Sequence, residues 1–150
     1  MNVKLSALIC VLGLSLIGNL SAATVRTIEI TVNDQMKYDV ATINAKPGET
    51  IKIKLKAAGS MPKNIMAHNF VVLKKTADVN AFVTKANTSN TTGYMPPDLK
   101  TQVIAASGLI GNGETTEITF KVPTAAGSYP YLCTFPGHYA AGMKGTLVIK

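Results

Sequence analysis

The sequence predicts an all-β protein, a β-sandwich of Greek-key type with a short helix and flap inserted between strands. Apolar and polar residues alternate with a period of two in several short runs, as half-buried antiparallel strands require. Turns rich in glycine and proline separate these runs, and many short strands joined by turns are typical of a sandwich. Only one stretch, residues 76–99, departs from this rhythm.

The first 23 residues have the pattern of a secretory signal peptide. Lys4 gives a positive start, an uncharged apolar run follows over residues 5–17, and small residues at 21–23 suit cleavage. The apolar run is short for a membrane span, although an uncleaved amino-terminal anchor is the alternative. We therefore expect residues 1–23 to be removed and residues 24–150 to form one exported domain.

Export changes what the cysteines and charges imply. Cys10 leaves with the signal, so Cys133 is the one thiol in an oxidising compartment, where binding a metal as thiolate would protect it. The net charge of +7 becomes +6 once Lys4 is removed. A basic surface favours anionic partners, but nucleic acid is a poor candidate because the basic residues are spread along the chain.

The strands follow from the alternation. They are predicted over residues 27–32, 51–56, 70–73, 117–122, 129–133 and 145–150. Pro47-Gly48 forms the turn before the second of these, in which lysines alternate with Ile51, Ile53 and Leu55 and mark a solvated face. Residues 111–113 (GNG) form the turn before the fourth.

The helix is predicted from residue 78 to residue 86. Apolar residues recur there at helical spacing, and Thr76 or Asp78 is a candidate N-cap. Residues 87–97 are polar and contain glycine and proline. We therefore expect residues 76–99 to form a helix and flap that lie outside the sandwich.

A metal site is predicted on the last loop. Four residues separate Cys133 from His138, and four separate His138 from Met143. A thiolate, an imidazole and a thioether form a soft donor set, and copper prefers two His and one Cys with a weak axial Met. The second imidazole comes from His68, the one other histidine of the chain.

Other chemistries use the same residues less well. Zinc accepts Cys and His but not Met as a usual fourth ligand. A thiol hydrolase lacks a third group to orient its base, and a multicopper oxidase needs more than two histidines. The alternative that stays open is a non-redox copper-binding or copper-buffering protein.

Two segments carry a resemblance to a known family. Residues 61–70 (MPKNIMAHNF) and 133–138 (CTFPGH) resemble azurin, among the cupredoxins or blue copper proteins, and residues 106–114 and 143–147 support this. The resemblance implies an eight-stranded Greek-key sandwich in the bacterial periplasm. It also implies single-electron transfer through one type 1 copper ion, cycling between Cu(I) and Cu(II), without enzymatic activity.

The resemblance assigns roles to individual residues. His68, Cys133 and His138 would bind copper in a plane, with Met143 and the Ala67 carbonyl as weaker axial donors. The residues expected around these ligands are Asn69, Thr134 and Phe135, with Asn69 joining the two ligand segments by hydrogen bonds. Azurins usually have glycine where Ala67 stands and three residues, not four, before the methionine. The longer loop resembles that of auracyanin.

The resemblance also implies a docking surface. Partners would approach His138 through apolar neighbours, Met66, Phe135 and Pro136. We expect other redox proteins as partners, in transient complexes: a c-type cytochrome, a copper reductase or oxidase, or a photosynthetic complex. No small-molecule substrate is implied, and we expect a monomer.

Overall fold

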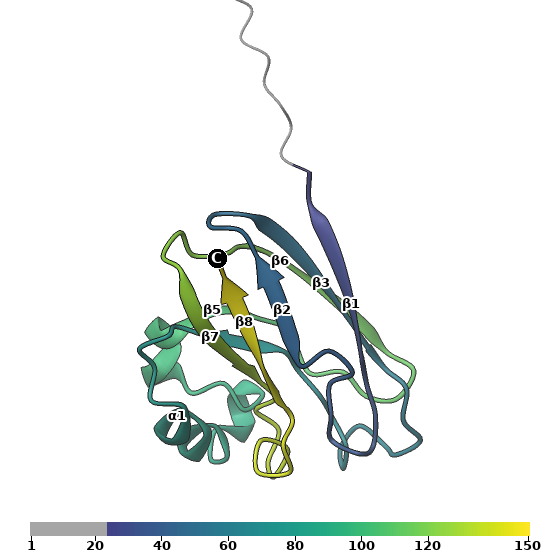
Figure 1. The fold of residues 1–150 in the computed structure, drawn as a ribbon. Helices are drawn as coiled ribbons and strands as arrows, with labels where there is room; N and C mark the ends of the chain where they lie inside the picture. Colours follow the sequence, from purple (N-terminus) through teal and green to yellow (C-terminus); the bar gives the residue numbers. More distant parts are fainter. Residues whose placement is uncertain (1–23) are drawn as a thin grey trace, which may run out of the picture.

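The computed structural model describes residues 24–150, which fold into two β-sheets packed face to face (Figure 1). One sheet has the strand order β1-β3-β6 and the other the order β2-β8-β7-β4-β5. The all-β prediction is confirmed, and the predicted signal peptide at 1–23 lies outside the described residues. The strands are β1 (Arg26–Val32), β2 (Thr42–Ala45), β3 (Thr50–Ala57), β4 (Val71–Leu73), β5 (Val103–Ala106), β6 (Thr115–Lys121), β7 (Gly127–Leu132) and β8 (Lys144–Ile149).

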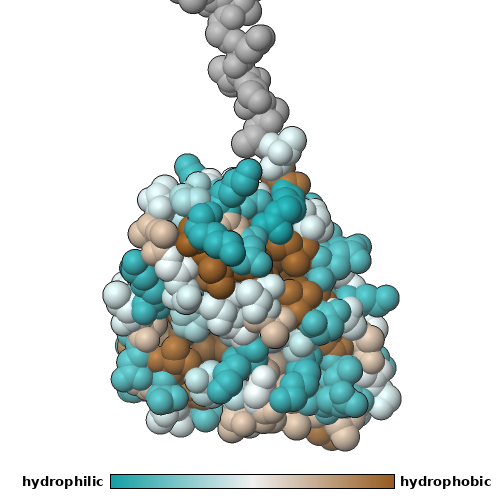
Figure 2. Space-filling model, viewed as in Figure 1, coloured by the Kyte–Doolittle hydropathy of each residue, from teal (hydrophilic) through white to brown (hydrophobic). Residues whose placement is uncertain are grey.

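The period-two pattern divides β3 into a core face and a solvent face. Ile51, Ile53 and Leu55 are at most 1% exposed and pack in the core between the sheets. The alternating lysines point outward, where Lys54 Nζ lies 3.0 Å from a carboxylate oxygen of Glu29. The predicted solvated face is therefore present. Figure 2 shows that hydrophilic side chains cover much of the viewed surface, with hydrophobic surface exposed in separate places.

Two strand pairs differ from the antiparallel arrangement that the alternation predicted. β1 pairs with β3 in parallel, and β2 pairs with β8 in parallel, whereas the other pairs are antiparallel. The chain crosses from β1 to β2 in the other sheet and returns to β3, so β1 and β3 run in the same direction. Alternation reports which face is buried and carries no information on the direction of the neighbouring strand.

The short strands β2 and β5 were not among the strands located from the sequence. β2 contains four residues, of which only Ile43 and Ala45 are buried, and all four residues of β5 are at least partly exposed. Runs this short give a weak periodic signal. Together with the six predicted strands they complete the eight strands of the described residues.

The helical insertion covers the outer face of the larger sheet. Helix α1 (Val79–Ala86) begins at Asp78, whose side chain accepts a hydrogen bond of 3.0 Å from Ala81 N. Phe82 is fully buried in a cluster with Val71 and Leu73 of β4, while the intervening Val72 faces the main core. Two 3-10 helices follow, η1 (Asn90–Thr92) and η2 (Pro97–Gln102). Between residues 24 and 150, no helix is both long and apolar enough to cross a membrane.

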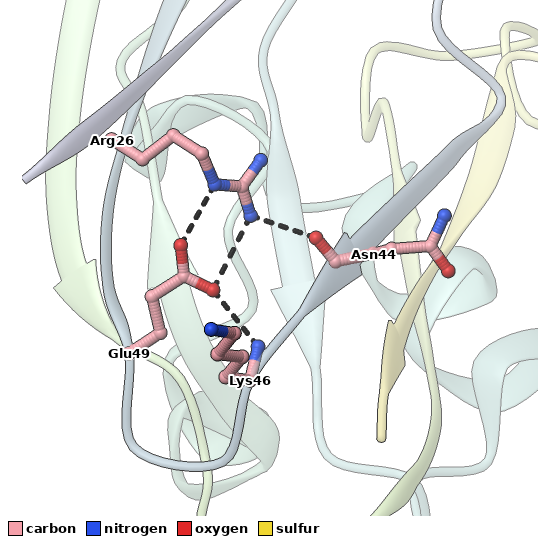
Figure 3. A network of polar contacts seen from close by, with 4 residues as sticks. All are labelled: Arg26, Asn44, Lys46 and Glu49. Atoms are coloured by element: carbon pink, nitrogen blue, oxygen red, sulfur yellow. Dashed lines mark hydrogen bonds and ion pairs between the residues drawn. The ribbon is translucent and has the colours of Figure 1, made fainter.

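The two ends of the sandwich differ in character. At the end where β1 begins and β2 ends, Arg26 Nε donates to Glu49 at 2.7 Å and its Nη2 to the Asn44 carbonyl at 2.7 Å (Figure 3). This polar network joins the edge strands of the two sheets. The loops after β1, β3 and β7 lie at the opposite end, where the predicted ligand segments gather (Figure 1).

Candidate metal centre

Two segments from different strands position the predicted ligands. His68 forms a β-bridge with Ile110, with both backbone hydrogen bonds at 2.8 Å, immediately before β4. Cys133 directly follows β7, and its backbone N–H donates to the Met143 carbonyl at 3.2 Å. The ligand loop, residues 133–143, is therefore closed on itself by backbone hydrogen bonds where it leaves and re-enters the sheet.

The donor atoms of His68, Cys133 and His138 lie within 4.8 Å of one another. The Sγ of Cys133 is 3.5 Å from Nδ1 of His138, and the two imidazole rings lie 4.9 Å apart. All three side chains are at most 2% exposed. The fold thus brings His68 to two donors that lie 65 and 70 residues further along the chain. The three donor atoms are close enough together to bind one metal ion.

His68 Nδ1 fits the role of a metal ligand for a further reason. It is buried and has no hydrogen-bond partner within residues 24–150. A buried polar atom without a partner is costly, and native proteins satisfy such atoms. A metal ion bound beside Cys133 Sγ and His138 Nδ1 would satisfy it, so the donor set fits a soft cation such as copper.

Burial controls the protonation of the three donors. It raises the pKa of the Cys133 thiol to about 11 and, with His68 as a lesser cause, lowers the pKa of His138 to about 4. The pKa of His68 is also lowered by burial. At neutral pH both imidazoles are therefore neutral and free to bind a metal, whereas Cys133 must release a proton when it does so.

Met143 and Ala67, the other two predicted donors, are also buried. Met143 is 0% exposed and belongs to the same core cluster as Cys133, and Ala67, which precedes His68, is 2% exposed. The Met143 backbone N–H donates to the His138 carbonyl at 2.9 Å. That bond fixes the spacing of the two residues on the loop.

Asn69 joins the two ligand segments. Its side-chain Nδ2 donates to Thr134 Oγ1 at 2.7 Å, and its Oδ1 accepts from the Thr134 backbone N–H at 2.9 Å. Both residues are about 1% exposed. Each is adjacent to a predicted ligand, so this pair of hydrogen bonds holds His68 and Cys133 in fixed relative positions.

Tyr38 is a supporting residue that the sequence analysis did not find. Its hydroxyl donates to the Asn69 carbonyl at 2.6 Å, and its ring packs edge-on against Phe70 and Tyr131. Burial raises the pKa of the Tyr38 phenol well above its ordinary value, so the hydroxyl remains a donor at neutral pH. Its position in a loop, far from both ligand segments, gives no sequence signal of this contact.

Apolar side chains surround the outer edge of the site. Met66, Phe135 and Pro136 are partly exposed, and the Phe135 ring lies 4.9 Å from that of His138, which is itself 2% exposed. Ile65 and Met61, which the sequence analysis did not single out, are 58% and 43% exposed in the same segment. The sequence signal that could have identified them is the presence of large apolar residues in the polar segment just before His68.

The chain is similar to known copper proteins over nearly all of the described residues. The profile of the family described as copper binding proteins, plastocyanin/azurin family, matches residues 25–150. Azurin from Pseudomonas denitrificans is 39% identical over 127 residues, which are 83% of this chain and 98% of that protein.

Solved structures give the same picture. Reduced auracyanin from the photosynthetic bacterium Roseiflexus castenholzii superposes with a TM-score of 0.74 at 34% identity, covering 86% of this chain and 99% of that one. Auracyanin A, a "blue" copper protein from Chloroflexus aurantiacus, gives a TM-score of 0.73 at 34% identity, with 85% and 100% covered.

Proposed function

The chain belongs to the plastocyanin/azurin family of copper-binding proteins, and from that premise we propose how its residues divide the work of an electron carrier. Family membership confirms the predicted resemblance, the single type 1 copper ion and the function of a blue copper electron-transfer protein. The roles of single residues, the docking surface and the compartment are the proposal. The observation that carries it is the buried cluster of His68, Cys133 and His138 donors.

We assign the strong metal contacts to three atoms, His68 Nδ1, Cys133 Sγ and His138 Nδ1. Met143 sulfur and the Ala67 carbonyl would be the weaker donors. When bound, copper supplies a one-electron couple between Cu(I) and Cu(II). To hold the metal, Cys133 would give up its proton and bind as a thiolate, and the two imidazoles would bind as neutral donors.

Rigidity of the donors is what the surrounding residues contribute. Electron transfer is fast when the site rearranges little between its two redox states. The Asn69–Thr134 hydrogen bonds and the Tyr38 hydroxyl hold the two ligand segments, and the interior is close-packed around them. This support favours an electron carrier over a protein that only buffers copper, since a buffer has no need of a fixed donor geometry.

We propose that partners dock on the apolar surface over His138. Met66, Phe135 and Pro136 form its centre, and the exposed Ile65 and Met61 extend it. Weak redox encounters bury little surface, and an apolar contact releases readily. The partner would be another redox protein, a c-type cytochrome, a copper reductase or oxidase, or a photosynthetic complex, and the encounter would take place in the bacterial periplasm after export.

A charge introduced at this surface tests the docking proposal. Met66→Glu should slow electron self-exchange at least roughly tenfold, because two copies must then bury like charges against an apolar surface. The absorption spectrum of the oxidised protein should stay unchanged, since Met66 is outside the donor set. The matched control is Thr119→Glu, an exposed residue on the outer face of β6.

The control should exchange electrons at close to the parent rate. If Met66→Glu also does so with its spectrum intact, the electron does not leave through His138 and another exit must be sought. Loss of the spectrum in Met66→Glu would instead place Met66 in the metal site itself and contradict its assignment to docking.

A further inference from the structure

The segment between His138 and Met143 is held by a contact from a distant part of the chain. Lys37 Nζ donates to the Ala141 carbonyl at 2.8 Å, across 104 residues of sequence. Gly142 permits this approach, because a Cβ atom there would lie 2.6 Å from Lys37 Nζ. Gly142 also has a φ of 97°, which side-chain-bearing residues rarely adopt.

Lys37 extends from a backbone that is itself fixed. The neighbouring Tyr38 is buried, its ring packs against Phe70 and Tyr131, and its hydroxyl reaches the Asn69 carbonyl at 2.6 Å. Two neighbouring residues therefore contact both ligand segments. Lys37 contacts the ligand loop at Ala141, and Tyr38 contacts the segment of His68 at Asn69. Lys37 itself is exposed, and its backbone is held in place by the buried Tyr38.

The charge of Lys37 is not cancelled by a carboxylate. None of the ion pairs among residues 24–150 includes Lys37. Its ammonium group lies on the carbonyl of a residue two positions before Met143. A positive charge near a redox centre disfavours the more positive oxidation state, and because Lys37 is exposed, solvent and salt weaken this effect.

We propose that Lys37 is a positioning residue for the electron-transfer site, which fixes the ligand loop through the Ala141 carbonyl and raises the reduction potential through its charge. The inference rests on the proposed ligand roles of His138 and Met143. The electron gained on reduction comes from the donor protein and lowers the charge of the metal by one unit. Lys37 favours that lower charge and itself gains or loses nothing.

Three variants separate the two contributions. Lys37→Met keeps the length of the side chain but removes both the donor and the charge. Lys37→Arg keeps both. Lys121→Met removes one positive charge at the other end of the sandwich, where Lys121 pairs with Thr50 at the start of β3, and none of the ion pairs among the described residues includes it.

The first measurement uses the metal-free protein, so that it does not depend on copper binding. Amide hydrogen exchange at Ala141, Gly142 and Met143 should be roughly threefold or more faster in Lys37→Met, as loss of one hydrogen bond implies. Lys37→Arg and Lys121→Met should exchange at the parent rate. Unchanged exchange in Lys37→Met would overturn the positioning role.

The second measurement is the reduction potential of the copper-loaded proteins by voltammetry. Lys37→Met should have a lower potential than the parent and than Lys121→Met, and Lys37→Arg should restore the parent value. Equal potentials in Lys37→Met and Lys121→Met would overturn the electrostatic role. Failure of the parent protein to give a reversible one-electron wave would contradict the proposed function, and the exchange result would still decide the loop contact.

Discussion

At the scale of single residues, we predict that Met143 tunes the site without being needed to retain copper. A thioether is a weak, long axial ligand, and it stabilises Cu(II) more than Cu(I). Met143→Leu should therefore keep the colour of the oxidised protein and raise its reduction potential, as measured by voltammetry. An unchanged potential would mean that the longer segment before Met143 holds its sulfur out of bonding range.

The metal-free protein should lose stability in mild acid. His138 has a pKa of about 4 in the folded protein against an ordinary value of 6.5, so the unfolded chain takes up the proton first. Stability is then complete above pH 6.5 and falls as the pH drops to about 4, by on the order of 3 kcal/mol. Denaturant unfolding of the metal-free protein at several pH values measures this.

His138→Gln is the matched variant for the pH experiment. It removes the titrating group while keeping a polar side chain of similar size. Its stability should fall less between pH 6.5 and pH 4 than that of the parent. A parent protein that is equally stable at both pH values would show that His138 takes up its proton normally in the folded state.

The sequence could predict the part of the site whose residues are close together in the chain. Cys133, His138 and Met143 stand on one short segment, so their spacing alone indicates a metal loop. His68 was assigned as the one remaining histidine and by resemblance. Tyr38 and Lys37 could not be predicted, since their contacts span 31 and 104 residues and depend on how the loops meet after folding.

At the scale of secondary-structure elements, α1 stabilises the larger sheet, and its cluster meets the ligand loop through Tyr139 and not through the predicted ligands. Phe82 fills the cluster that covers the outer face of β4, while Cys133 and Met143 belong to the main core. Phe82→Ala should lower the free energy of unfolding by about 3–5 kcal/mol, as for other buried aromatic truncations. The absorption band of the oxidised protein should be retained.

Denaturant unfolding and an absorption spectrum of the same sample test this separation. Val83→Ala, a smaller truncation at a partly buried position of the same helix, is the control and should cost much less. Loss of the band in folded Phe82→Ala would show that the helix cluster supports the ligand loop, through Leu132 beside Cys133.

The elements differ in how well the sequence predicted them. β3 and α1 were found because their apolar residues recur with a clear period and, for α1, because Asp78 caps the helix. β2 and β5 were missed because four partly exposed residues leave little pattern. The parallel pairing of β1 with β3 depends on the crossing between sheets, which no local pattern records.

At the scale of the whole molecule, we predict that the net charge and the apolar surface act at different stages of an encounter. On the proposed docking surface, the +6 charge left after removal of Lys4 would steer an anionic partner from a distance, and the apolar surface over His138 would form the contact. Raising the ionic strength should therefore slow association with an acidic redox partner, roughly tenfold or more between low and physiological salt.

Self-exchange is the control for this salt dependence. It brings two apolar surfaces together and should change much less over the same range of ionic strength. Stopped-flow kinetics measure both rates. Equal salt dependence of the two reactions would contradict the division between steering by charge and docking by apolar contact.

The absorption spectrum of the Cu(II)-loaded protein, compared with that of Cys133→Ser, tests the central claim most directly. A thiolate and two imidazoles around Cu(II) give an intense sulfur-to-copper charge-transfer band, so the parent should be blue or blue-green with one copper per chain. Cys133→Ser should fold, as judged by circular dichroism, and lack the band. Persistence of the band in the folded variant would contradict the assignment of Cys133 as the thiolate ligand.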